Sequence, residues 1–201
     1  ATSGDQVAVS FDPACSDRVF RIGLTDDVEL SLMPELIRSV RRNAPQVTLI
    51  VQHADYRRLP DQLVSGDISI GICQTRDLPA NAKRKKLRDI PCKVLRGDTR
   101  EGPLTLDEYC ERPHAMVSFS GDLSGNIDLD LAKLGRSRRV VLGVPQFSGL
   151  RALLAGTEMI ATVPDYAACA LVEGCGLRAE DPPFPIDAAQ LSMAWSGVHL
   201  A

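Results

Sequence analysis

The feature that most constrains the fold is an alternation of short apolar runs with stretches in which apolar residues recur at helical spacing. In the first third of the chain, runs at 20–24, 47–51 and 68–72 have strand character, and helical spacing is found at 32–40 and 59–64. Pro45 and Gly66 stand where these helices should end. Short strand–helix–strand links predict right-handed crossovers on a parallel sheet.

The same pattern starts again near residue 92. We expect strands at 92–95, 115–119, 140–144, 159–163, 177–179 and 190–195, and helices at 104–109, 128–134, 150–154 and 166–172. The predicted fold class is therefore α/β, with two successive units of similar size, each with its own parallel sheet. The charge run at 83–86 is predicted to be a solvated loop without a function.

Composition narrows the function. The chain has 201 residues, of which 44% are hydrophobic and 24% charged, as in an ordinary globular protein with one core or two small cores that share a hinge. Its formal net charge of -3 provides no general basic field that could hold a phosphate backbone. We therefore expect any contact with DNA to come from a part of the protein outside this chain.

The six cysteines form no CxxC pair, and the three histidines complete no metal-binding spacing. This pattern predicts small buried thiols in a reducing compartment, with no metal and no cofactor. No apolar run approaches the ~20 residues of a membrane span, and the N-terminus has no signal-peptide pattern, so we expect a cytoplasmic protein without a membrane partner. The polar start at 1–5 indicates an excised fragment or a processed protein.

Several segments carry a family resemblance by their order and spacing. They are FDP at 11–13, FRI at 20–22, LMPEL at 32–36, LVSGDISIGI at 63–72, PHAMVS at 113–118, RRVV at 138–141 and LLAGTEMIATVP at 153–164. Together they resemble the effector-binding domain of LysR-type transcriptional regulators over residues 11–195, in the subgroup of nodulation and aromatic-catabolism regulators. No single segment is specific to this family, but the order and spacing of all the segments together are.

The resemblance implies a type-II periplasmic-binding-protein fold, in which two Rossmann-like lobes are joined by crossover strands. Residues 1–17 would be a linker remnant, 18–92 with 184–201 the first lobe, and 93–183 the second. The crossovers would lie near 93–95 and 177–185, and the strand at 191–195 would return to the first lobe.

The chain departs from the family in two places. Many members have a His-Pro where residues 96–102 stand, which predicts a different local shape of the cleft. Only residues 196–201 follow Trp195, where the family has one more helix, so a truncated or disordered end is expected. The N-terminal DNA-binding domain of the family would lie outside the chain.

Candidate ligand contacts follow from a general rule, because open α/β sheets bind ligands beyond the carboxyl ends of their strands. Thr25, Asp26 and Asp27 follow the first predicted strand and could bind a ligand, or they could only cap the next helix. Two adjacent carboxylates disfavour a bare anion, unless one points away or pairs with Arg57 or Arg58.

Three further segments supply the remaining candidates. Tyr56 follows the second strand, where the resemblance implies a polar group facing the cleft. Gln146 and Phe147 follow the strand at 140–144, and an amide beside an aromatic ring suits a flat organic ligand. His114 precedes a strand and could reach the cleft. Packing alone is the alternative for Tyr56, His114 and Phe147.

Catalytic patterns are missing from the sequence. Residues 118–121 lack the first glycine of a nucleophile elbow, the side chains of Asp26 and Asp27 should diverge, and there is no phosphate loop. We therefore predict a sensor that closes on a small aromatic or carboxylated effector. A secreted solute-binding protein of a transporter is the alternative, and an enzyme is the third. The helix at 32–40 is the expected dimer surface, antiparallel to 128–134 of a second copy, in a homodimer or homotetramer.

Overall fold

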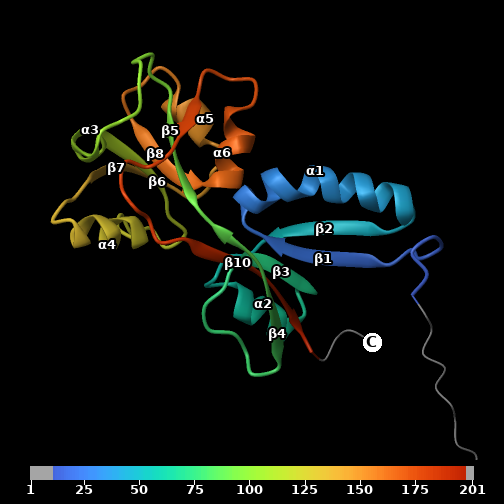
Figure 1. Cartoon of the computed structure of the whole chain (residues 1–201). Coiled ribbons are helices and arrows are strands. Elements are labelled where there is room, and N and C mark those ends of the chain that lie inside the picture. Colours follow the sequence, from blue (N-terminus) through green and yellow to red (C-terminus); the bar gives the residue numbers. More distant parts are fainter. Residues whose placement is uncertain (1–10, 198–201) are drawn as a thin grey trace, which may run out of the picture.

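A computed structural model describes residues 11–197, in which the chain forms two five-stranded sheets side by side (Figure 1). Their strand orders are β2-β1-β3-β10-β4 and β7-β6-β8-β5-β9. We call the first sheet with helices α1 and α2 the first lobe, and the second sheet with α3 to α6 the second lobe. The expected α/β fold is confirmed, but both sheets are mixed rather than parallel. β10 runs antiparallel to β3 and β4, and β5 runs antiparallel to β8 and β9.

The elements of the first lobe are β1 (Val19–Leu24), α1 (Asp26–Asn43), β2 (Thr48–His53), α2 (Leu59–Ser65), β3 (Ile70–Gln74), β4 (Ala82–Ile90) and β10 (Ala189–Ser196). β1 pairs in parallel with β2 and β3, as the short crossovers require. Gly66 ends α2 in the left-handed region, with φ of 76°, which glycine adopts without steric cost. At Gly71 a Cβ atom would lie 2.2 Å from Leu59 Cδ1, so a larger residue would require the Leu59 side chain to shift.

The elements of the second lobe are β5 (Cys92–Arg96), α3 (Leu106–Glu111), β6 (Pro113–Val117), α4 (Asn126–Lys133), β7 (Arg139–Val144), α5 (Leu150–Leu154), β8 (Ile160–Pro164), α6 (Asp165–Val172) and β9 (Arg178–Glu180). Leu95, Leu150 and Leu154 form part of its fully buried core. Thr105 caps α3 through a capping box with Glu108.

The chain passes between the lobes twice. β4 ends at Ile90 and β5 begins at Cys92, so Pro91 alone separates a strand of one sheet from a strand of the other. The return runs from the end of β9 at Glu180 to β10. The first crossover thus lies just before the predicted residues 93–95, which belong to β5. The second crossover runs over 181–188, so it overlaps the predicted segment 177–185 and extends beyond it. The predicted lobe limits stay a prediction, and residues 1–10 and 198–201 lie outside the described part.

The prediction of a loop at 83–86 was wrong, because these residues belong to the edge strand β4. Residues 83–89 are exposed throughout, so neither face of the strand shows the apolar alternation by which strands are recognised. Lysine and arginine on an edge strand also discourage pairing with another chain. The charge run is therefore compatible with a strand that has water on both sides.

All six cysteines are free. Cys73 is buried, as expected, but Cys15 and Cys169 are exposed. In the part of the chain that the structure describes, no helix has both the length and the apolar character needed to cross a membrane.

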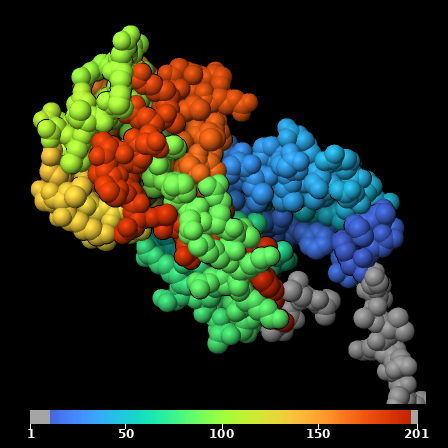
Figure 2. All heavy atoms as spheres, viewed as in Figure 1, coloured from blue at the N-terminus to red at the C-terminus, as the bar shows by residue number. Residues whose placement is uncertain are grey.

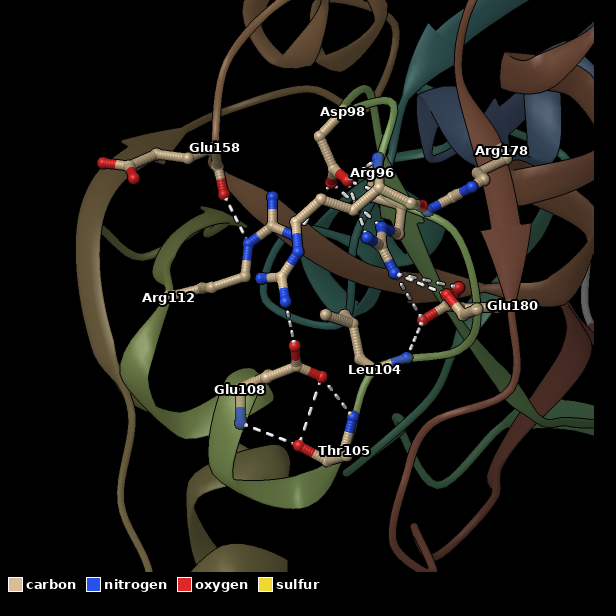
Figure 3. A network of polar contacts seen from close by, with 11 residues as sticks. Arg96, Asp98, Leu104, Thr105, Glu108, Arg112, Glu158, Arg178 and Glu180 are labelled. Carbon is tan, nitrogen blue, oxygen red and sulfur yellow. Dashed lines mark hydrogen bonds and ion pairs between the residues drawn. The ribbon is translucent and has the colours of Figure 1, made fainter.

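A buried network of ion pairs fixes the loop between β5 and α3 (Figure 3). Arg96 is 2% exposed and donates to both oxygens of Asp98, with Nε–Oδ2 and Nη2–Oδ1 distances of 2.9 and 2.6 Å. On its other side it contacts Glu180, which also accepts from the Leu104 backbone N–H at 2.8 Å. Arg112 adds an ion pair to Asp98 at 2.8 Å. The network includes residues of the segment 96–102, and through Glu180 it ties this loop to the edge strand β9.

We expect Asp98→Asn to destabilise the chain by about 2 kcal/mol at pH 7, the usual contribution of hydrogen bonds to charged groups. The Arg96 guanidinium, with Arg112, holds the pKa of Asp98 well below its usual range. The carboxylate therefore stabilises the fold above its unfolded pKa of about 3.9, and this stabilisation is lost as the pH falls toward the folded value. In urea denaturation, the difference in free energy of unfolding between the unchanged chain and Asp98→Asn should narrow below pH ~4.

Asp181→Asn is the matched control, because the Asp181 side chain is 85% exposed and forms an ion pair with Lys93 at 2.6 Å on the surface. An exposed pair contributes little, so this variant should unfold like the unchanged chain. Equal losses in the two variants would show that burial of the Arg96 network is not what stabilises the loop.

Candidate functional site

The carboxyl ends of three parallel strands in each lobe face the space between the lobes. They enclose a cavity of about 70 Å³. It is lined by Thr25, Asp27, Tyr56, Gln74, Phe119, Phe147 and Tyr166. Thr25, Tyr56 and Gln74 stand at the ends of β1, β2 and β3, and the three remaining aromatic residues follow β6, β7 and β8. The cavity is thus formed by the loops at the carboxyl ends of the parallel strands of both sheets.

Asp26 joins the two lobes instead of facing the cavity. Its Oδ1 accepts from the Phe147 backbone N–H at 3.1 Å, and its Oδ2 accepts from the Ser148 N–H at 2.9 Å. Asp26 is 9% exposed. Two backbone donors of the β7–α5 loop are thereby satisfied by a carboxylate of the other lobe, so the charge of Asp26 is already bound within the protein.

Asp27 is the buried charged group of the cavity. It is 4% exposed, and its Oδ2 accepts from the Tyr166 hydroxyl at 2.8 Å. Burial raises the pKa of Asp27, and the nearby hydroxyls of Thr25 and Tyr166 offset only part of this effect. Of these two hydroxyls, Tyr166 alone makes a hydrogen bond of regular geometry. Oδ1 is buried without a hydrogen-bond partner among the described residues.

A second cavity of about 200 Å³ adjoins the first and shares Gln74 and Phe147 with it. Its walls come from both lobes and include Ile90, Met116 and Arg138. The Arg138 side chain is 3% exposed and pairs with Asp128 at 2.9 Å, so its charge is already compensated. A ligand larger than the central cavity could extend in this direction.

On the other side of Phe119 lies an open groove of about 810 Å³ beside α2. His53 and Gln146 are among its lining residues. The Arg57 side chain of the first lobe reaches the second lobe here and donates to the Phe119 carbonyl at 2.6 Å. Phe119 contacts His53 edge-on, with ring centroids 5.5 Å apart, and stands between this groove and the central cavity.

The structure brings most of the predicted site residues together. Thr25, Asp27, Tyr56 and Phe147 line the central cavity, and Asp26 binds the loop that carries Phe147. The carboxylates of Asp26 and Asp27 point to different partners, as their adjacency predicted.

The other two candidates lie elsewhere. Gln146 is exposed and lines the open groove rather than the central cavity. His114 is fully buried in the second lobe, where its Nε2 bonds the Tyr109 carbonyl at 2.7 Å. Burial lowers the pKa of His114 to about 4, so the ring is neutral near pH 7. Its position is that of a core side chain, which was the alternative considered for it.

Gln74, Phe119 and Tyr166 were not among the predicted residues. Each ends or closely follows a parallel strand, so the rule that selected Thr25 would have selected them too. Within residues 11–197 there is no cluster of three or more His, Cys, Asp or Glu side chains that could hold a metal ion.

We expect Asp26→Ala to loosen the contact between the lobes, because two backbone N–H groups would lose their acceptor. Hydrogen exchange of the Phe147 and Ser148 amides should then become roughly ten-fold faster or more, as expected for the loss of about 1.4 kcal/mol of protection. Asp26→Asn, which keeps one acceptor oxygen, should show a smaller change. Unchanged protection in Asp26→Ala would contradict a role for this carboxylate in holding the lobes together.

Comparison with known proteins places these features in a family. The family described as the LysR substrate binding domain matches residues 16–198. The HTH-type transcriptional activator NahR of Pseudomonas putida is 30% identical over 190 residues, which are 92% of this chain and 63% of that protein. Nodulation protein D 1 of Rhizobium tropici is 31% identical over 195 residues, or 94% of this chain and 62% of that protein. The chain thus spans less than two thirds of these relatives.

Among solved structures, the regulatory domain of MexT, a transcriptional activator in Pseudomonas aeruginosa, has 60% sequence identity and a TM-score of 0.85. The match covers 89% of this chain and 90% of that domain. Both the aromatic-catabolism and the nodulation regulators expected from the sequence are present among the relatives. The two-lobed, type-II periplasmic-binding-protein-like fold is confirmed as well.

Proposed function

This chain belongs to the LysR substrate-binding domain family, and on that premise we propose that the cleft between its lobes binds a small effector of a transcriptional regulator. The observation that carries the proposal is the cavity at the strand ends, where side chains of both lobes meet around Phe147. A ligand in this position touches both lobes at once, so its binding energy depends on how they are arranged.

We further propose that the domain binds its effector without transforming it, in the cytoplasm, and that promoter DNA is bound by another part of the protein. The relatives support this proposal, since NahR is a transcriptional activator and the chain spans only 63% of its length. The net charge of -3 agrees with a domain that does not hold DNA itself. A transporter's solute-binding protein, the alternative from the sequence, has no support among these relatives.

The contacts between the lobes indicate how binding would be transmitted. Asp26 accepts hydrogen bonds from two backbone N–H groups of the second lobe, and Arg57 donates to a backbone carbonyl there. Arg88 of β4 forms an ion pair with Asp165 of α6. Figure 2 shows the second lobe in contact with the end of α1. An effector shifts the arrangement of the lobes only as far as it binds one arrangement better than another.

We also propose that the chain self-associates through α1, antiparallel to α4 of a second copy. Leu30 and Ile37 of α1 are 37% and 38% exposed, and Leu129 of α4 is 65% exposed. Apolar side chains that are exposed on two helices of one molecule can cover each other in a two-fold symmetric dimer.

We expect an aromatic ligand found in a thermal-shift screen to bind Phe147→Ala roughly ten-fold more weakly, because the ring contributes stacking and apolar contact. Isothermal titration of both chains measures the difference. Phe11→Ala is the control, since Phe11 is 49% exposed and packs against Phe20 outside the cleft. Equal affinities in all three chains would exclude the cleft as the binding site.

If α1 forms the dimer interface, Ile37→Asp should sediment as a monomer at concentrations where the unchanged chain is a dimer, because a buried charge without a partner opposes association. Val64→Asp, at a 66% exposed position of α2, should leave the dimer intact. A chain that stays monomeric at high concentration would overturn the dimer proposal.

A further inference from the structure

We propose that the effector is an aromatic compound that carries a hydrogen-bond donor, a hydroxyl or an amino group, and that Asp27 Oδ1 accepts this hydrogen bond. The inference rests on the proposed function of the cleft and narrows the chemical class of its ligand. It excludes the carboxylated effectors that the sequence left open.

The geometry of Asp27 carries the proposal. Asp27 is one of the residues that line the central cavity and is 4% exposed, with Oδ2 accepting from the Tyr166 hydroxyl at 2.8 Å. Oδ1 has no hydrogen-bond partner in the described part of the chain, although a buried oxygen of a carboxylate is costly to leave unpaired. A donor placed in the cavity by a ligand would remove this cost.

The charges around the cavity oppose an anion. The two backbone N–H groups that could bind a carboxylate, at Phe147 and Ser148, are already occupied by Asp26. No Lys or Arg is among the described residues that line the central cavity. Arg138, a basic residue in the wall of the adjoining cavity, is paired with Asp128 at 2.9 Å. The Arg76 guanidinium lies 4.0 Å from the Tyr56 ring centroid, but Arg76 is not among the residues that line either cavity. A ligand carboxylate would therefore meet Asp27 without a cation in the described wall of the central cavity to offset the repulsion.

The remaining walls select a ring. Tyr56, Phe119, Phe147 and Tyr166 line the central cavity, and Phe119 and Phe147 have ring centroids 6.4 Å apart. These two rings pack edge-on against each other, and the aromatic surfaces of the wall favour a flat apolar ligand beside them. The adjoining space of about 200 Å³ provides room for the rest of a small ring compound.

Phenol, anisole and benzoate test the proposal, because they share a ring and differ in the group offered to Asp27. Their dissociation constants are measured by ligand-observed NMR at pH 7. Phenol should bind about ten-fold more tightly than anisole, which lacks the donor, and benzoate should be the weakest. In Asp27→Leu the ratio of phenol to anisole affinity should fall to about one, mainly through weaker binding of phenol.

Asp27→Asn keeps the shape of the side chain and guards against a folding defect in the leucine variant. With its oxygen turned to Tyr166 it presents an amino group to the cavity, so benzoate should gain affinity over phenol. Asp61→Asn is the matched control, because Asp61 lines only the open groove and should leave the ratio unchanged.

The outcomes distinguish failure of the donor inference from failure of the proposed function of the cleft. If Phe147→Ala weakens all three probes but anisole or benzoate binds as well as phenol, the donor inference is overturned and the cleft remains the site. A ratio that survives both Asp27 variants would also overturn the role of Asp27. If no probe binds, or if Phe147→Ala has no effect, the proposed function fails, and this inference fails with it.

Discussion

The structure depends on one topological constraint: parallel strands joined by right-handed crossovers must place their connecting loops at the carboxyl edge of the sheet. Here two sheets turn these edges toward each other, and the chain passes between them at Pro91 with a single intervening residue. The loops after β1, β2 and β3 therefore meet those after β6, β7 and β8. Side chains that are far apart in the sequence, such as Thr25 and Phe147, line one cavity for this reason.

Polar contacts across the cleft give the lobes a defined arrangement. Asp26 binds two backbone N–H groups, Asp27 accepts from Tyr166, and Arg57 donates to the Phe119 carbonyl. These contacts are individually worth about 1 to 3 kcal/mol at most, so a ligand of ordinary affinity can compete with them. The Asp26 carboxylate occupies donors that a ligand anion could otherwise use, whereas one Asp27 oxygen has no hydrogen-bond partner among residues 11–197. Asp26 therefore fixes the arrangement of the lobes, while in our proposal the adjacent Asp27 recognises the ligand.

Much of this arrangement could be predicted from the sequence, because periodicity reports which face of an element is buried. The order of the other strands and helices and the end of α2 at Gly66 followed from local rules. β4 could not be recognised, since both its faces are in water, and β5 and β10 could not be identified as antiparallel, because strand direction depends on tertiary pairing. Likewise the sequence could not show that His114 is buried or that Asp26 is bound to the other lobe, because both facts depend on long-range contacts.

A ring that carries a hydrogen-bond donor is proposed to bind between the lobes at Asp27. A crystal structure of the chain grown with 4-bromophenol tests it most directly, because the anomalous signal of bromine locates the ligand independently of its shape. We expect a bromine peak between the lobes beside Phe147, with the phenol oxygen within about 2.5–3.0 Å of Asp27 Oδ1. Bromine found only in the open groove lined by His53 and Gln146, or only on the outer surface, would contradict it.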